Sequence, residues 1–151
     1  MKNIVFVSLL LAALSGWMVT SGCGIKNVPF EDVSVETKCA ALASIVELGI
    51  TPILQNNPVL IPAFKEVSAR GLLILTQENA ELRQEEVLNL FEELVTATGG
   101  AGRSAALVRG LLRVVNSMIV FPEETEVLKE EVLQYARSVM DGVNFAVMHV
   151  Q

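Results

Sequence analysis

Three arginines that follow a glycine-rich turn form the most specific chemical pattern in this 151-residue sequence. The turn at 99–102 opens a helical segment, whose free backbone N–H groups could hold an anion beside Arg103. Without a phosphate-loop lysine or a preceding strand, however, the turn is more typical of a connection between helices. Arg109 and Arg113 lie further along the same segment, four residues or one helical turn apart. We favour their pairing with glutamates of the preceding helix over contact with an anionic lipid or a partner's carboxylate.

The other reactive side chains are too isolated to predict a catalytic or metal site. His149 is the only histidine, and it stands near the end of the sequence. Cys39 falls within an apolar helical stripe, which predicts a buried structural thiol. Glutamates occur in pairs on helix faces predicted to be exposed, whereas a catalytic carboxylate needs burial or a close partner; the pairs are at 85–86, 92–93, 123–124 and 130–131. The sequence therefore predicts no enzyme, no metal site and no cofactor.

From residue 33 onward, apolar residues recur with helical periodicity. The side chains discussed above must therefore be positioned by helices. A first apolar stripe is predicted to end at Gly49 and Pro52, because both residues disfavour a helix interior. A second segment spans 58–76, with Asn57 as its predicted cap. A third, at 85–96, places apolar residues on one face and glutamates on the other.

The last two predicted helices differ in character. At 105–120, after Ser104 as a cap, nearly the whole circumference is apolar, which predicts the central helix of a bundle. Residues 121–124 combine a proline with two glutamates, as at a helix start, and an apolar tail follows Gly142. No strand pattern or internal repeat is found. The sequence thus predicts an all-α fold, a small bundle of four to five helices in one domain at 33–151.

The composition limits the class of partner. Hydrophobic residues make up 52% of the chain and charged residues 19%, which excludes an intrinsically disordered protein. The net charge of −6 argues against nucleic acid as a partner. Because about half of the chain is apolar, one small core is not expected to bury all of it, and this favours a protein partner or a homo-oligomer.

Residues 1–22 have the pattern of a cleaved secretory signal. Lys2 provides a positive start, and an apolar run at 4–14 contains only Ser8 as an interruption. The small residues Thr20, Ser21 and Gly22 then stand directly before Cys23. This arrangement resembles the lipobox of bacterial lipoproteins. The resemblance implies a diacylglyceryl group on the Cys23 thiol, cleavage before Cys23 and acylation of the new amino group.

Residues 23–32 would form a short tether from the lipidated cysteine to the helical domain. The nine residues after Cys23 span at most about 30 Å, so the domain would be held close to the membrane. Several acyl chains anchor a protein far more firmly than one. Gly24 is not the aspartate that commonly retains such lipoproteins in the inner membrane, which favours the outer membrane if the source has two.

These observations predict a membrane-anchored, non-catalytic helical lipoprotein of the bacterial envelope. It would act as a structural or protein-interaction module. The alternative is a carrier or binding protein for a hydrophobic or anionic lipid, with Arg109 and Arg113 at its site.

Overall fold

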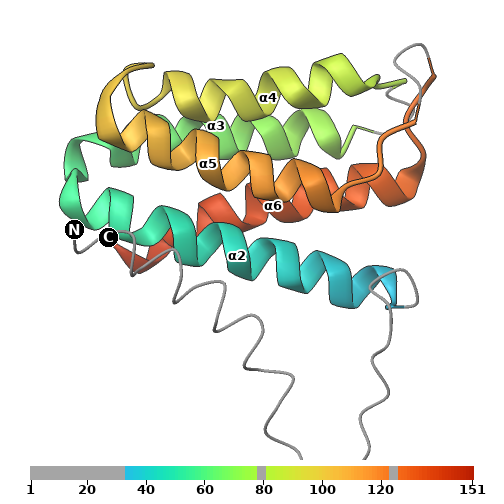
Figure 1. Ribbon diagram of the computed structural model, residues 1–151, viewed down its shortest axis with the longest axis horizontal. Coiled ribbons are helices and arrows are strands. Elements are labelled where there is room, and N and C mark those ends of the chain that lie inside the picture. Colours follow the sequence, from blue (N-terminus) through green and yellow to red (C-terminus); the bar gives the residue numbers. More distant parts are fainter. Residues whose placement is uncertain (1–32, 78–80, 123–125) are drawn as a thin grey trace, which may run out of the picture. The chain divides into compact units, whose positions relative to one another are not determined.

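The helices of the chain form an all-α bundle (Figure 1). The computed structural model describes residues 33–77, 81–122 and 126–151. The predicted signal, Cys23 and the tether lie outside the described residues. The fold-class prediction is confirmed, since five α-helices and one short 3₁₀ helix account for the named elements of the described part: α2 (Val35–Asn56), η2 (Pro58–Leu60), α3 (Ile61–Leu75), α4 (Gln84–Thr96), α5 (Gly102–Met118) and α6 (Glu130–His149).

Helix α2 is longer than the sequence predicts. It begins after Ser34, whose hydroxyl accepts a hydrogen bond from the Thr37 backbone N–H at 3.3 Å, and it continues through Pro52 to Asn56. The Thr51 hydroxyl donates to the Glu47 carbonyl, and the Asn56 amide donates to the Pro52 carbonyl. Packing of the apolar residues on both sides of Pro52 outweighs the lost backbone bond, so the predicted end at Gly49 and Pro52 is wrong.

The length and apolar composition of α2 would also allow it to cross a membrane. Its apolar face is nevertheless used inside the bundle. Leu42, Val46 and Ile50 are almost completely buried, and α2 packs most extensively against α6. This packing is typical of a core helix.

The second predicted segment is confirmed as η2 followed by α3. Pro58 and Pro62 both fall within first turns, where no backbone N–H bond is lost. Asn57 takes the predicted cap position, but its side chain makes no cap bond: its amide donates instead to the Ile53 carbonyl and to the Ser104 hydroxyl, each at 3.3 Å. The latter bond ties the end of α2 to the first turn of α5.

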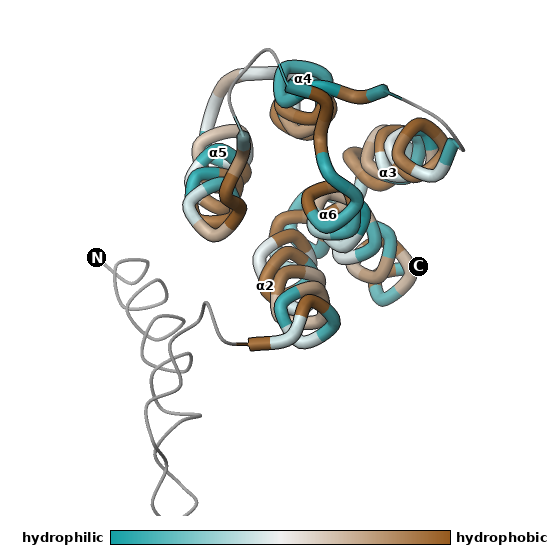
Figure 2. Tube along the Cα trace, turned by 90° about the vertical axis from the view of Figure 1, so that its right-hand side faces the viewer, coloured by the Kyte–Doolittle hydropathy of each residue, from teal (hydrophilic) through white to brown (hydrophobic). Residues whose placement is uncertain are grey.

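Helix α6 occupies the centre of the bundle, between α2 and α3 (Figure 2). Ala136, Gly142 and Ala146 are buried on it, and such small residues let neighbouring helices approach closely. The prediction that 105–120 is the central helix is wrong. Helix α5 packs mainly against α2 and α4, and its Leu107 and Val114 remain 46% and 47% exposed.

The start of α6 also differs from the prediction at 121–124. The helix begins at Glu130, because the backbone of the two residues at 127–128 pairs with the segment at 82–83 instead. The Leu128 N–H donates to the Leu82 carbonyl at 2.8 Å, and Arg83 and Val127 form an isolated antiparallel bridge. The predicted apolar tail is helical to His149, with Gly142 inside the helix.

Candidate binding groove between α4 and α5

Helix α4 has the face that its sequence predicts. Its start is closed by the Glu86 carboxylate, which accepts from the Arg83 backbone N–H at 2.7 Å. The predicted apolar residues are buried, and the charged residues remain toward solvent. The buried residues of this face are Val87, Leu90, Phe91, Leu94 and Val95.

A glycine turn reverses the chain between α4 and α5. Gly99, Gly100 and Gly102 have φ angles of 88°, 73° and 84°, a left-handed region in which residues with a Cβ are strained. Helix α5 therefore begins at Gly102, and Ala101 takes the cap position predicted for Ser104. The turn is a helix connection, as expected.

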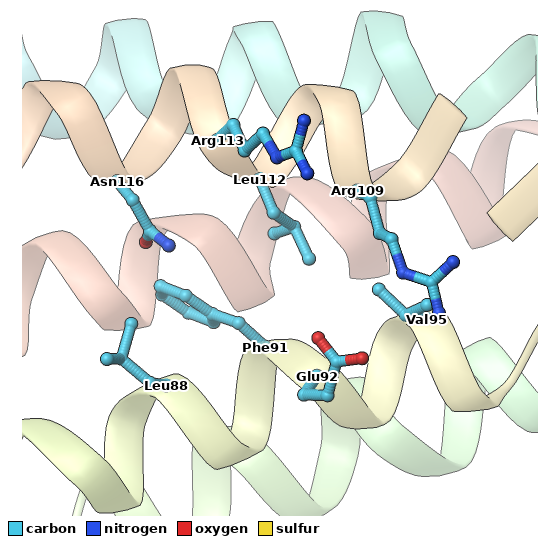
Figure 3. A pocket seen from close by; sticks show the side chains of 8 residues that line it. All are labelled: Leu88, Phe91, Glu92, Val95, Arg109, Leu112, Arg113 and Asn116. Carbon is cyan, nitrogen blue, oxygen red and sulfur yellow. The ribbon is translucent and has the colours of Figure 1, made fainter. Parts of the chain in front are cut away.

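A groove of about 350 Å³ lies between these two helices (Figure 3). This volume falls within the range of about 300–1,000 Å³ that small-molecule sites occupy. The floor is apolar, because Phe91, Val95 and Leu112 are at most 6% exposed. Figure 3 shows these side chains between the helices, with Arg109 at one end and Asn116 at the other. The complete lining is Leu88, Phe91, Glu92, Val95, Arg109, Leu112, Arg113 and Asn116.

The two groove arginines do not pair with α4, which corrects the interpretation favoured from the sequence. The Arg109 guanidinium donates to the Gly100 carbonyl at 3.0 Å, across the glycine turn. Arg113 forms neither an ion pair nor a hydrogen bond within the described residues. The α4 carboxylate that does pair is Glu93, whose partner is Arg70 of α3. Both groove arginines are consequently left with donors that face solvent.

Asn116 adds an unused acceptor to the same wall. Its Oδ1 atom is buried without a hydrogen-bond partner among the described residues. A buried polar atom without a partner costs about 1–3 kcal/mol. Arg109, Arg113 and Asn116 follow one another at spacings of four and three, so they form a polar stripe along the groove. The arrangement can hold a molecule with an apolar body, an anionic group and a hydrogen-bond donor.

The remaining candidate residues lie apart from this groove. Arg103 is exposed in the first turn of α5 and does not line it. Cys39 is half-buried and packs against the core, near Tyr135, rather than being fully buried as predicted. Cys23 is outside the described residues. In the described ranges, no group of three histidine, cysteine or acidic side chains could hold a metal ion.

His149 and some of the paired glutamates have structural partners. The His149 imidazole lies 2.6 Å from the Glu47 carboxylate, which joins the end of α6 to α2. The Glu130 carboxylate accepts from the Arg137 guanidinium, and the Glu131 carboxylate accepts from the Tyr135 hydroxyl. Burial, together with this hydrogen bond, raises the pKa of Tyr135. The expectation that His149 is inert at the end of the chain misses this contact.

Sequence reasoning finds Arg109 and Arg113 but not the floor of the groove. It assigns Phe91 only to the core, and it places Asn116 in a narrow polar stripe. One feature of the sequence could have brought these residues together. Only a short turn separates the predicted apolar face of α4 from the polar stripe of α5. Such neighbours must be antiparallel, and the stripe then faces the groove.

Comparison of the chain with models of known families, with curated proteins and with solved structures gives no match.

Proposed function

We propose that this protein is a lipid-anchored, non-catalytic helical lipoprotein of the bacterial envelope that binds an amphiphilic anion in the α4–α5 groove. Support for the anchor comes from the sequence, where small residues precede Cys23 at the end of an apolar signal. Support for binding comes from the groove, where an apolar floor adjoins cationic side chains. The two parts of the proposal, the anchor and the ligand, are tested separately.

The observation that carries the binding proposal is the unused hydrogen-bonding capacity of one wall. Arg113 has no partner in the described part of the chain, and the Asn116 Oδ1 atom is buried there without one. An anionic group can satisfy Arg109 and Arg113 together, because the two side chains are one turn apart. An N–H or O–H group of the same molecule can satisfy the Asn116 Oδ1 atom once the side-chain amide turns from its buried position into the groove. An acyl chain would lie over the half-buried Leu88 and the small exposed parts of Phe91 and Leu112.

A protein-interaction or structural role is the competing function, and the sequence alone places it first. The groove favours a small amphiphile because its apolar floor is buried between the two helices, whereas its arginines are exposed. Affinity capture of the protein from membranes, followed by mass analysis of proteins and lipids, separates the two. A co-purifying single-chain acidic lipid supports our proposal, and a stoichiometric protein without such a lipid contradicts it.

A designed probe tests the groove directly. N-dodecanoylglycine combines an acyl chain, an amide N–H and a carboxylate, so it matches the three features of the site. We expect native mass spectrometry of the detergent-solubilised protein to show one bound probe. Its uncharged methyl amide should bind weakly, because Arg109 and Arg113 lose their partner. Dodecanoate should bind more weakly than N-dodecanoylglycine, because it offers nothing to Asn116.

Variants show whether binding occurs at this site. Replacing Arg109 and Arg113 by Gln should abolish binding of N-dodecanoylglycine, while Arg103→Gln is the matched control because Arg103 lies outside the groove. Equal binding by the parent and both variants would place the probe elsewhere and would refute the site.

The anchor is tested by the intact mass of the protein purified from membranes. We expect a chain that begins at Cys23 and carries acyl groups. Cys23→Ala should release the protein from membranes or leave its signal uncleaved. An unmodified chain that begins elsewhere would contradict the proposed lipidation.

A further inference from the structure

The outward face of α5 carries an exposed stripe that the groove does not use. Arg103, Leu107, Gly110 and Val114 follow one another at spacings of four, three and four, so they share one side of the helix. All four are exposed, and a Cβ atom added at Gly110 would meet nothing within 4 Å. We call these four residues the outer stripe of α5. The described part of the bundle leaves this stripe uncovered.

The stripe combines apolar side chains with positive charge. Leu107 and Val114 are both about half exposed, and Leu111, one turn from Leu107, packs against Gly49 of α2. The sequence of α5 contains three arginines and no acidic residue. The chain as a whole has a net charge of −6, so α5 concentrates positive charge on an otherwise acidic protein.

An apolar stripe on a basic helix is the pattern of helices that lie in a membrane interface. On this stripe, Leu107 and Val114 would enter the boundary between headgroups and acyl chains, and Arg103 would remain beside the phosphates. A protein partner would also cover Leu107 and Val114. The absence of any carboxylate from α5 favours an anionic lipid surface, which repels carboxylates and attracts arginines.

We propose that the outer stripe of α5 docks on an anionic membrane surface. This inference rests on the membrane anchoring proposed above, which would hold the bundle near a bilayer. Docking lays α5 along the surface and leaves its opposite, buried face in the bundle. The α4–α5 groove then opens beside the lipid headgroups, from which an amphiphilic anion could enter it.

Fluorescence quenching by brominated lipid tests this docking. The full-length protein is purified from membranes and placed in vesicles of phosphatidylcholine and brominated phosphatidylglycerol. Two variants carry a reporter tryptophan, Leu107→Trp on the outer stripe and Leu73→Trp on α3. Leu73 is a matched control, because it is also an exposed leucine, 64% accessible, on another helix. Trp17 leaves with the cleaved signal, and in an uncleaved chain its fluorescence would be common to both variants and to the parent.

Docking predicts strong quenching of the reporter in the Leu107→Trp protein and little quenching in the Leu73→Trp protein. Adding Arg103→Gln to the Leu107→Trp protein should reduce the quenching, as should high salt, because screening weakens the attraction to headgroups. Equal quenching at the two positions would overturn the inference. So would an unquenched reporter at position 107, including the case in which a second copy of the chain, detected by cross-linking at that position, covers the stripe.

The mass of the same preparation distinguishes failure of docking from failure of anchoring. An acylated Leu107→Trp protein with an unquenched reporter overturns docking alone. A Leu107→Trp protein that lacks acyl groups but has a quenched reporter overturns the anchor and retains the docking surface.

Discussion

Gly142 of α6 faces Ala43 of α2 so closely that a side chain at position 142 has no space. A Cβ atom added there would overlap the Ala43 carbonyl group and would lie 2.8 Å from the Val46 Cβ atom. At this point the two most extensively packed helices therefore meet backbone to backbone. Backbone atoms cannot move aside as the end of a flexible side chain can.

Replacing Gly142 by Ala should accordingly lower the free energy of unfolding. Overpacking of a core costs about 1–3 kcal/mol, and the clash with backbone places this change toward the upper part of that range. Gly110→Ala is the matched control, because position 110 is helical and open to solvent. It should stabilise the protein by about 0.4–1 kcal/mol through the reduced entropy of the unfolded chain. Chemical denaturation measures both, and similar values for the two variants would contradict the packing of α2 on α6.

Replacing Arg109 and Arg113 together by Gln should change stability by no more than about 1 kcal/mol. Both side chains are exposed, and the only hydrogen bond lost within the described residues is that from Arg109 to the Gly100 carbonyl. Circular dichroism and thermal unfolding should therefore resemble those of the parent. A loss of about 3–5 kcal/mol would instead indicate a buried partner for one of the arginines.

The Asp141 carboxyl makes stability depend on pH in the acid range. Its partial burial in α6 raises its pKa, so the folded protein binds the proton more tightly than the unfolded chain does. Stability from this group is present below the ordinary aspartate pKa and is lost as pH rises through the folded-state pKa. Asp141→Asn should remove this dependence and make the protein slightly more stable at neutral pH. Urea denaturation between about pH 3 and about pH 7 checks the sign; a variant that is less stable at neutral pH would refute it.

The thiol of Cys39 should react slowly in the folded protein. It is half-buried and packs against the core, so a labelling reagent has only partial access. Labelling should be clearly faster in denaturant. Equal rates in the two conditions would show that the thiol points to solvent and that the apolar stripe of α2 is assigned wrongly.

Local patterns predict α4 and α3 well, because the residues of each helix are sufficient to predict it without knowledge of its neighbours. The alternation of apolar and acidic residues in α4 is sufficient to fix which face is buried. The two prolines of the η2–α3 segment both fit first turns. The all-α class follows from the same periodicity and needs no knowledge of contacts.

The position of each helix in the bundle could not be predicted in this way. The sequence pattern favours the segment at 105–120 as the central helix, yet α6 is central, because its small residues Ala136, Gly142 and Ala146 let neighbouring helices approach closely. That advantage depends on close backbone contact, which a count of hydrophobic residues does not measure. In the same way, Pro52 predicts a helix end, although packing on both sides of it keeps α2 continuous.

The candidate site could be predicted only as far as its charged residues. Arg109 and Arg113 are conspicuous on an apolar segment, but their partners depend on which α4 carboxylates come within reach. Glu93 pairs with α3, and Glu92 lies in the groove without a salt bridge within the described residues. Glu92 and Glu93 are adjacent, so the rotation of α4 about its axis by one residue decides which of them meets α3. Sequence periodicity does not define this rotation so finely.

The central place of α6 has a consequence for when the protein can fold. During synthesis, α2 and α3 leave the ribosome before α6, the helix against which both pack. Until residues 130–149 have emerged, the earlier helices lack their principal packing surface and have no stable arrangement. A chain made in this order lacks its bundle until α6 has been synthesised. With the secretory signal proposed above, such late folding would keep the domain unfolded while it passes through a translocation channel.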